Sequence, residues 1–337
     1  MKKVLYFLAA SAAALCTIAC NKDLNSSTPV QGQEQASVRE GEPCQLRVGI
    51  SGGELTKSTS ITTEDEAEVK LLQVYVFRGD ALDAYAKVAN SKEITVSCTA
   101  GERVIYALVN DIERPNVKTK TELLALTSSL TNTAANGFAM IGSATKTLPQ
   151  ASTVTIDVNR LASRVVIKKI SRAFTSAGLA AQDLKVEKIW IQNVATDLNL
   201  GLTEAPTTWI NKMSLDATPY ALVADNVESS IANNAAYETK HTFFCYPNPT
   251  VADSNDATWC ARHTRLVVQV KLGTSDTYYY PITLPVLEYN KSYEIENLTL
   301  TRPGSDNPDV PVTFQDCTFD INIKPWTVVP VTEGLTI

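Results

Sequence analysis

The segment Phe319-Asp320-Ile321-Asn322-Ile323-Lys324, close to the end of the chain, alternates apolar and polar residues. This period of two predicts a strand with one buried face formed by Phe319, Ile321 and Ile323. Pro325 should then interrupt the strand pairing, because proline has no N–H group to donate. A second apolar run, 326–337, follows to the end of the sequence. Such a run is either a last core strand or a strand that seeks a groove, including one in another molecule.

The same period of two recurs along most of the chain. Residues 69–77 predict a strong strand, and the nearly continuous apolar run 104–109 is typical of a central strand. Residues 264–272 and 277–284 predict a hairpin across a Gly-containing turn. Further strands are expected at 44–50, 91–98, 153–158, 185–194, 240–246 and 293–301.

Only one helix is indicated, over 119–130, by leucines that follow a Thr119–Glu122 capping box. Strands therefore dominate, and they do not alternate with helices as they would around a parallel sheet. The sequence predicts a mainly β protein with two β-sandwich domains and few short helices. We place these domains at 44–159 and 160–337.

The amino-terminal segment carries an export signal. Lys2 and Lys3 precede a short apolar stretch, and Thr17-Ile18-Ala19-Cys20 is similar to a bacterial lipobox. This pattern predicts a lipoprotein signal peptide, 1–19, cleaved before Cys20, which would then carry acyl chains. The alternative is an ordinary secretory signal with an incidental cysteine. Residues 20–43, rich in Ser, Thr, Gln, Glu and Gly, predict a flexible tether.

Charge and motif content exclude several classes of function. The net charge is -6 and no basic stripe is present, which argues against a nucleic acid partner. His241 and His263 are the only histidines, and no nucleophile elbow, zinc motif or phosphate loop occurs. We therefore expect neither an enzyme nor a cofactor. Arg78-Gly79-Asp80 spells an adhesive tripeptide, but its place directly after a strand favours a turn.

An odd number of cysteines lies beyond Cys20, so they cannot all pair with one another. Cys245 and Cys260 flank a turn-rich loop and could form a disulfide, or they could stay separate thiols packed as small apolar groups. The five cysteines are Cys44, Cys98, Cys245, Cys260 and Cys317.

Several stretches together carry a more specific signal. They are 20–23, 69–77, 98–110, 138–142, 158–165, 290–295, 304–308 and 326–329. In this order and spacing they resemble the bacteroidete fimbrillins, the major-fimbria or type V pilin subunits. The resemblance implies two transthyretin-like β-sandwich domains, export as a lipoprotein and assembly by strand exchange. It also implies a place in the cell outer membrane and in surface fimbriae, reached through the periplasm.

In such subunits a protease outside the cell removes the segment that carries the lipid and the first strand. The opened groove then accepts a strand from a neighbouring subunit. By this resemblance the displaced strand contains Cys44, Leu46, Val48 and Ile50. The donated strand contains Trp326, Val328, Val329, Val331, Leu335 and Ile337. The implied partners are other pilin subunits and the outer membrane, with host or bacterial surface receptors as further partners.

The sequence departs from the family at the processing site. The family places an arginine just after the first strand, but none occurs here between Arg47 and Arg78. Three outcomes follow: cleavage after Lys57 by a lysine-specific protease, cleavage at Arg47 within the strand, or no cleavage. An uncut chain would be a lipid-held anchor subunit. A monomeric surface lipoprotein that binds glycan or host protein is the alternative outside the pilin class.

N-terminal sequencing of the surface-exposed protein separates these outcomes. A chain that begins at Ser58 is the result expected for cleavage after Lys57 and polymerisation. An acylated Cys20 would contradict it and support an anchor or a monomer.

Overall fold

The computed structural model describes residues 39–52, 68–215, 221–253, 259–274, 276–313 and 315–326. The expected signal peptide with Cys20, the tether up to residue 38, Lys57 and the tail beyond Trp326 lie outside the described residues. Within the described residues the fold is mainly β, as predicted, with only short helices. No helix in this part of the chain is long and apolar enough to cross a membrane.

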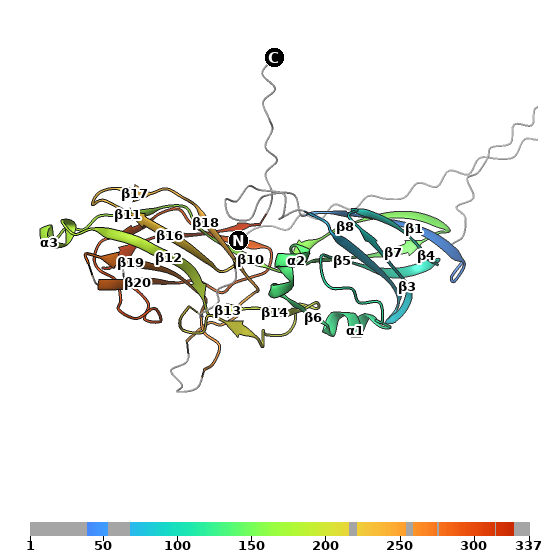
Figure 1. Cartoon of the computed structure of the whole chain (residues 1–337). Helices are drawn as coiled ribbons and strands as arrows, with labels where there is room; N and C mark the ends of the chain where they lie inside the picture. The colour runs from blue at the N-terminus through green and yellow to red at the C-terminus, as the bar shows by residue number, and fades with distance from the viewer. Residues whose placement is uncertain are drawn as a thin grey trace, which may run out of the picture. The chain divides into compact units, whose positions relative to one another are not determined.

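The first sheet has three strands in the order β4-β1-β8. They are β1 (Pro43–Ser51), β4 (Glu93–Thr99) and β8 (Ala151–Asp157). β1 lies in the middle, antiparallel to β4 and parallel to β8 (Figure 1). The expected strand at 44–50 is therefore confirmed, and its place between two other strands is now defined.

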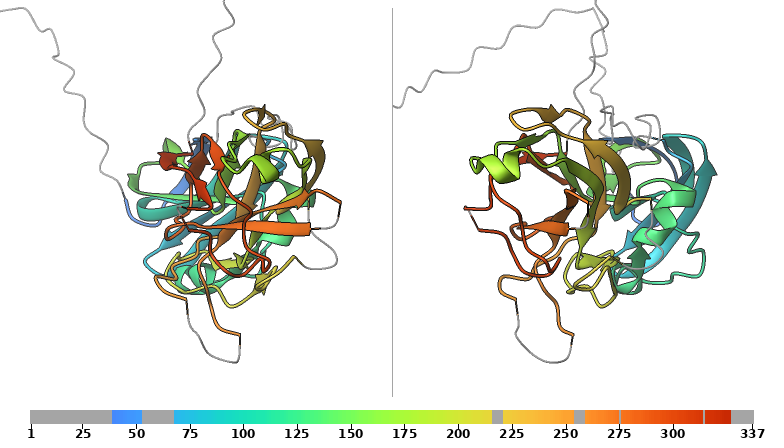
Figure 2. Two further views of the ribbon diagram at one scale, coloured as in Figure 1. Left: turned by 90° about the vertical axis from the view of Figure 1, so that its left-hand side faces the viewer. Right: turned by 60° about the vertical axis from the view of Figure 1, so that its left-hand side comes forward.

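A five-stranded sheet, β3-β2-β5-β7-β9, packs against the first sheet. Its strands are β2 (Leu71–Arg78), β3 (Ala81–Ala89), β5 (Gly101–Val109), β7 (Met140–Leu148) and β9 (Asn159–Arg160). Leu46 of β1, Val74 of β2 and Ile105 of β5 belong to one hydrophobic cluster, whose buried members all come from 44–158. Figure 2 shows these strands, coloured blue to green, from two further sides. The cluster is the sandwich core predicted by the alternating patterns.

The chain from residue 163 onward forms three four-stranded sheets, β18-β10-β21-β24, β17-β11-β22-β23 and β16-β12-β19-β20. Their strands are β10 (Ser163–Ile167), β11 (Ile170–Arg172), β12 (Leu184–Gln192), β16 (Ala224–Ser230), β17 (Ala236–Tyr237), β18 (His241–Cys245), β19 (Arg265–Leu272), β20 (Asp276–Thr283), β21 (Lys291–Ile295), β22 (Leu298–Leu300), β23 (Cys317–Thr318) and β24 (Ile321–Pro325). The first two sheets continue one another, since each strand of one adjoins its counterpart along the chain. The predicted hairpin is confirmed as β19 and β20, and Pro281 is accommodated because β20 is an edge strand.

The short elements are two strand pairs, β13-β15 and β14-β6, and a few helical turns. Their bounds are β6 (Thr127–Ser129), β13 (Val194–Ala195), β14 (Asp197–Asn199), β15 (Trp209–Ile210), α1 (Lys120–Ala125), η1 (Leu130–Asn132), α2 (Thr133–Asn136) and α3 (Ala177–Ala180). As predicted, the Thr119 side chain caps α1 by accepting a hydrogen bond from the Glu122 N–H. The helix is shorter than expected, because the next residues pair as β6 with β14. Tertiary pairing here overrides the leucine pattern.

The longest strands outside the expected ranges are β3, β7 and β16. β3 contributes mainly alanines to the sheet and β16 is largely polar, and both are edge strands that need little apolar surface. Residues 211–240, for which the sequence pattern predicts no strand, contain β16, which pairs with β12, and β17, which pairs with β11.

The predicted division between residues 159 and 160 falls within β9. Several contacts cross this point. Ser128 Oγ lies 3.0 Å from Tyr246 Oη, the rings of Phe138 and Phe244 are 4.6 Å apart, and β6 pairs with β14. A second hydrophobic cluster contains side chains from both sides. The division into two domains stays a prediction. If it holds, these contacts form part of the interface between the two domains.

The packing of β7 against the end of β8 generates a test of the sandwich. A Cβ atom added at Gly142 would lie 2.2 Å from the carbonyl oxygen of Asp157. Gly142→Ala should therefore lower the free energy of unfolding by about 1–3 kcal/mol, measured by urea denaturation. Gly178→Ala is the matched control, since nothing lies within 4 Å of its added Cβ. Equal stability of the two variants would contradict the close approach.

Candidate functional site

β1 is the central strand of its sheet, so both of its backbone edges are paired. It pairs with β4 over residues 43–49 and with β8 over residues 45–51. β4 and β8 lie on opposite sides of it and do not pair with one another. Removal of β1 would therefore leave unpaired donors and acceptors along both neighbours, as in grooves that take up an added strand.

The buried face of β1 carries the four residues predicted for the displaced strand. Cys44, Leu46 and Val48 have exposed fractions of 2%, 0% and 0%. Ile50 is partly buried and packs against the same cluster. Full burial of a side chain such as Leu or Val contributes about 1.5–3 kcal/mol. A strand that replaced β1 would have to fill these positions with apolar side chains of similar size.

The opposite face of β1 is exposed and held by weaker contacts. Arg47 forms an ion pair with Glu93, and Gln45 Nε2 donates a hydrogen bond to Ser97 Oγ at 3.0 Å. Exposed pairs of this kind contribute little to stability. β1 is therefore held mainly by its backbone hydrogen bonds and its buried face, and both could be supplied by another strand.

The segment before β1 is anchored by a buried arginine. The Arg103 side chain is fully buried, and its Nη1 lies 3.0 Å from Glu40 Oε1 while its Nε lies 3.1 Å from Asp83 Oδ2. Burial acts to raise the pKa of Asp83, but hydrogen bonds from Thr99 and Arg103 outweigh this effect and lower that pKa. The charge network thus connects Glu40, just upstream of β1, to β3 and β5.

The end of β1 is fixed by a glycine. Gly52 has φ +81°, and an added Cβ would lie 2.6 Å from the carbonyl oxygen of Val158. Val158 in turn donates its N–H to the Ser51 carbonyl at 2.9 Å. The chain therefore leaves the sheet at Gly52 in a left-handed conformation that suits glycine.

Trp326, the first residue of the predicted donor strand, lies in this molecule's own core. Its exposed fraction is 1%, and its ring stacks on Phe244 at 5.5 Å and meets Phe138 edge-on at 5.2 Å. The Cζ atoms of Arg160 and Arg164 lie 4.8 and 5.4 Å from the ring centroid. Trp326 thus anchors the carboxyl-terminal end, while Val328, Val329, Val331, Leu335 and Ile337 lie outside the described residues.

The strand before Trp326 differs in two respects from the expectation. Pro325 does not interrupt it but is its last residue, opposite Lys291, which an edge strand tolerates. Phe319 and Ile321 pack against the core as predicted. The prediction for Ile323 was wrong, since it is 54% exposed. β24 is the edge strand of its sheet, and a side chain at a sheet edge can lie outside the part of the sheet that is covered by the core.

Glu294 connects β24 to the rest of its sheet through charge. Its carboxylate lies 2.9 Å from Lys324 Nζ and 3.0 Å from Lys168 Nζ. Burial acts to raise the pKa of Glu294, but hydrogen bonds from Lys324 and Lys168 and their charges outweigh it and lower the pKa to about 2. The strand that precedes Trp326 is therefore held by an ionised, largely buried carboxylate.

Two further sequence expectations can be placed. Cys245 and Cys260 are both unbridged in this structure, their pairing stays a prediction, and burial raises the pKa of Cys245 to about 12. The turn predicted at Arg78-Gly79-Asp80 is confirmed, with Gly79 at φ +59°. Asp80 Oδ1 accepts hydrogen bonds from the backbone N–H and the hydroxyl of Thr121. The tripeptide's carboxylate is thus engaged within the molecule.

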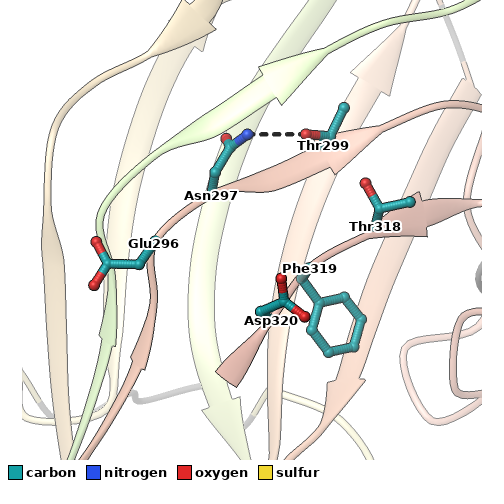
Figure 3. Close-up of a pocket in the computed structure, with 6 residues that line it drawn as sticks. All are labelled: Glu296, Asn297, Thr299, Thr318, Phe319 and Asp320. Atoms are coloured by element: carbon teal, nitrogen blue, oxygen red, sulfur yellow. Dashed lines mark hydrogen bonds between the residues drawn. The ribbon is translucent and has the colours of Figure 1, made fainter. Parts of the chain in front are cut away.

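Pockets in the described residues do not indicate a small-molecule site. One, with a volume of about 420 Å³, lies beside β22 and β23 (Figure 3). Phe319 is its one aromatic side chain, and it is otherwise lined by Glu296, Asn297, Thr299, Thr318 and Asp320. No group of His, Cys, Asp and Glu side chains that could hold a metal ion occurs in the described ranges. Tyr289 is the only aromatic residue among the large exposed apolar side chains of the described residues.

The geometry thus defines a β-sandwich protein whose first strand is held between two others. Residues 46–183 match the family model described as major fimbrial subunit protein (FimA). A major fimbrium subunit FimA type-2 of Porphyromonas gingivalis is 23% identical over 386 residues, which cover 93% of this chain and 94% of that protein.

Solved structures agree in fold. A fimbrilin from Porphyromonas gingivalis W83 has 17% identity and a TM-score of 0.61, covering 85% of this chain and 98% of its own. A putative cell adhesion protein from Bacteroides eggerthii has 18% identity and a TM-score of 0.63, covering 86% and 98%.

These matches confirm the resemblance to the fimbrillin family, and the chain is similar to a major fimbrial subunit along nearly its whole length. The relatives are structural subunits and not enzymes, in agreement with the prediction of a non-enzymatic function.

The Glu294 network generates a pH prediction. The folded-state pKa of about 2 lies below the ordinary value of 4.5, so the carboxylate's contribution to stability is complete above pH 4.5 and is lost as the pH falls toward 2. Glu294→Gln should therefore unfold at lower urea concentration than wild type at neutral pH, and the difference should shrink across this window. Glu296→Gln, an exposed partner of the same lysines, is the control. A difference that did not change with pH would contradict the assignment.

Proposed function

We propose that this chain is a structural subunit of a cell-surface fimbria that polymerises by strand exchange and supports adhesion. The single observation that carries the proposal is the position of β1, which alone joins β4 to β8. The similarity to major fimbrium subunits supports the fimbrial part of the proposal.

In the proposed reaction, a cut in the chain after β1 separates this strand from the rest of the molecule. Its departure exposes two rows of backbone groups and the pockets of Leu46 and Val48. A strand from a second subunit restores both at once, and the many hydrogen bonds make its dissociation slow. Because the donor end and the acceptor groove are different surfaces, the contact is head-to-tail and does not close, so a filament grows.

We propose that the donor segment begins after Trp326. The ring of Trp326 is fully packed in its own core, so it supports a role as the fixed base from which the following residues extend. In an extended strand Val329, Val331, Leu335 and Ile337 would share one face. The buried residues of β1 have the same two-residue spacing.

The cleavage site is proposed to be Lys57 and not Arg47. Arg47 lies in the middle of β1, where its backbone is within the pairing range of both neighbours. A protease that binds its substrate in an extended form would first have to free this strand. Lys57 is the only basic residue between Arg47 and Lys70 and lies beyond the end of β1 at Ser51.

The proposed route has four stages: export with the signal peptide 1–19, acylation at Cys20, passage through the periplasm to the outer membrane, and release by the cut. An uncut, lipid-held anchor subunit is the second proposal, favoured by the missing arginine between residues 47 and 78. In that case β1 would stay in place and the molecule could donate a strand but not accept one.

Deletion of residues 328–337 should leave a folded monomer that does not join fibres, because Trp326 and the core are kept. The measurement is the ladder of polymers on a gel, beside circular dichroism for folding. The control is Trp326→Ala in the full chain, which should lose about 3–5 kcal/mol of stability and yet retain the donor residues. Normal polymer ladders from the deletion would contradict the donor assignment.

A further inference from the structure

Two cysteines face each other across the boundary between the strand that would leave and a strand that would stay. Cys44 of β1 is directly opposite Cys98 of β4 in the antiparallel register. Both are buried, with exposed fractions of 2% and 7%, and both belong to the same hydrophobic cluster. Both are free thiols in this structure. The other described cysteines differ: Cys245 is opposite Ser163, Cys317 is opposite Leu300, and Cys260 lies outside the strands.

The local geometry suits a disulfide. The Gln45 N–H bonds to the Gln150 carbonyl on the β8 side, so the N–H of the preceding residue, Cys44, is directed to β4. Cys44 and Cys98 are therefore a hydrogen-bonded pair, for which the Cα atoms lie about 5.5 Å apart. Disulfides span Cα separations of about 4.4–6.8 Å and Cβ separations of about 3.5–4.5 Å. Directly opposite residues have Cβ atoms about 4.5–5.5 Å apart, so β1 and β4 would approach one another slightly as the bond closes. Residues directly opposite one another also present their side chains on the same face.

The surroundings define when such a bond could form. Burial raises the pKa of Cys98 to about 12, and the neighbouring Cys44 adds to this shift. The attacking species in disulfide exchange is the thiolate, which is scarce at neutral pH for such a thiol. Oxidation would therefore take place while β1 is still undocked, and the finished bond would be shielded by the core.

We propose that Cys44 and Cys98 form a disulfide in the exported protein, and that this bond keeps β1 attached to the body after the chain is cut. The oxidant is a disulfide of the exchange class, R–S–S–R, in an oxidising compartment. Two thiols are oxidised to one S–S bond while R–S–S–R is reduced to two R–SH, and the protons pass from the cysteines to the released thiols. The reverse exchange with a dithiol releases β1. The role of this latch in assembly rests on the proposed strand exchange, but the bond itself does not.

The bond can be mapped without any assembly assay. The exported protein is denatured in the presence of iodoacetamide, so that every free thiol is blocked as it becomes accessible, and is then digested with trypsin without a reductant. Trypsin leaves Cys44 in peptide 40–47 and Cys98 in peptide 93–103, each with a single cysteine. The expected result is one linked species of these two peptides in the mass spectrum, which dithiothreitol separates. Finding both peptides separately, each carrying the blocking group, would overturn the proposal.

The latch is tested by inserting a site for a sequence-specific protease after Lys57 and cutting the purified chain. In SDS without a reductant, the wild-type β1 fragment should stay with the body, and dithiothreitol should release it. Cys98→Ala should release the fragment without a reductant, whereas Cys245→Ala, another buried cysteine, should behave like wild type. Release of the β1 fragment from cut wild-type protein without a reductant would overturn the latch.

Fibre growth then separates this inference from the proposed function. Cut wild-type subunits should polymerise only after reduction, and cut Cys98→Ala subunits should polymerise without it. Equal growth of oxidised wild type and Cys98→Ala would overturn the latch. Failure of both to polymerise, with the linked peptides still present, would contradict strand exchange and leave the disulfide supported.

Discussion

The structure depends on one constraint: within the described part of the chain, β4 and β8 have no partner in common except β1. A strand in the middle of a sheet satisfies the donors and acceptors of two neighbours, whereas an edge strand satisfies those of one. Here the central strand is also the first strand of the described residues. A cut in one connection would therefore separate from the chain the element on which this sheet depends. Few positions in a β-sandwich combine central pairing with such simple covalent attachment.

The remaining features around β1 can be understood from this constraint. The Arg103 network with Glu40 and Asp83 fixes the chain before the strand, and Gly52 fixes it after the strand. The outer face, by contrast, carries only exposed pairs such as Arg47 with Glu93. Strong anchoring at the ends and weak contacts on the outer face are what the proposed exchange of β1 would require. At the other end of the chain, Trp326 supplies a rigid base beside Phe138 and Phe244.

The sequence was sufficient to predict the strands whose buried residues follow a regular local pattern. The alternation in β1 and the continuous apolar run in β5 predicted strands of the correct type and place. It was not sufficient for pairing, because hydrogen-bond partners far apart in the chain leave no local pattern. The parallel pairing of β1 with β8 and the opposition of Cys44 to Cys98 both come from this long-range register. The exposure of Ile323 and the early end of α1 were also decided by tertiary context, at a sheet edge and at a competing strand pair.

The central claim is that β1 can be exchanged for the carboxyl-terminal strand of another subunit. Its most direct test is to cut the reduced precursor between β1 and β2, add a synthetic peptide of residues 327–337, and follow the β1 fragment by native mass spectrometry. The account predicts that the peptide replaces the fragment one for one, and that a scrambled peptide of the same composition does not. A β1 fragment that stays bound at saturating peptide, while the cut protein still forms fibres, would contradict it.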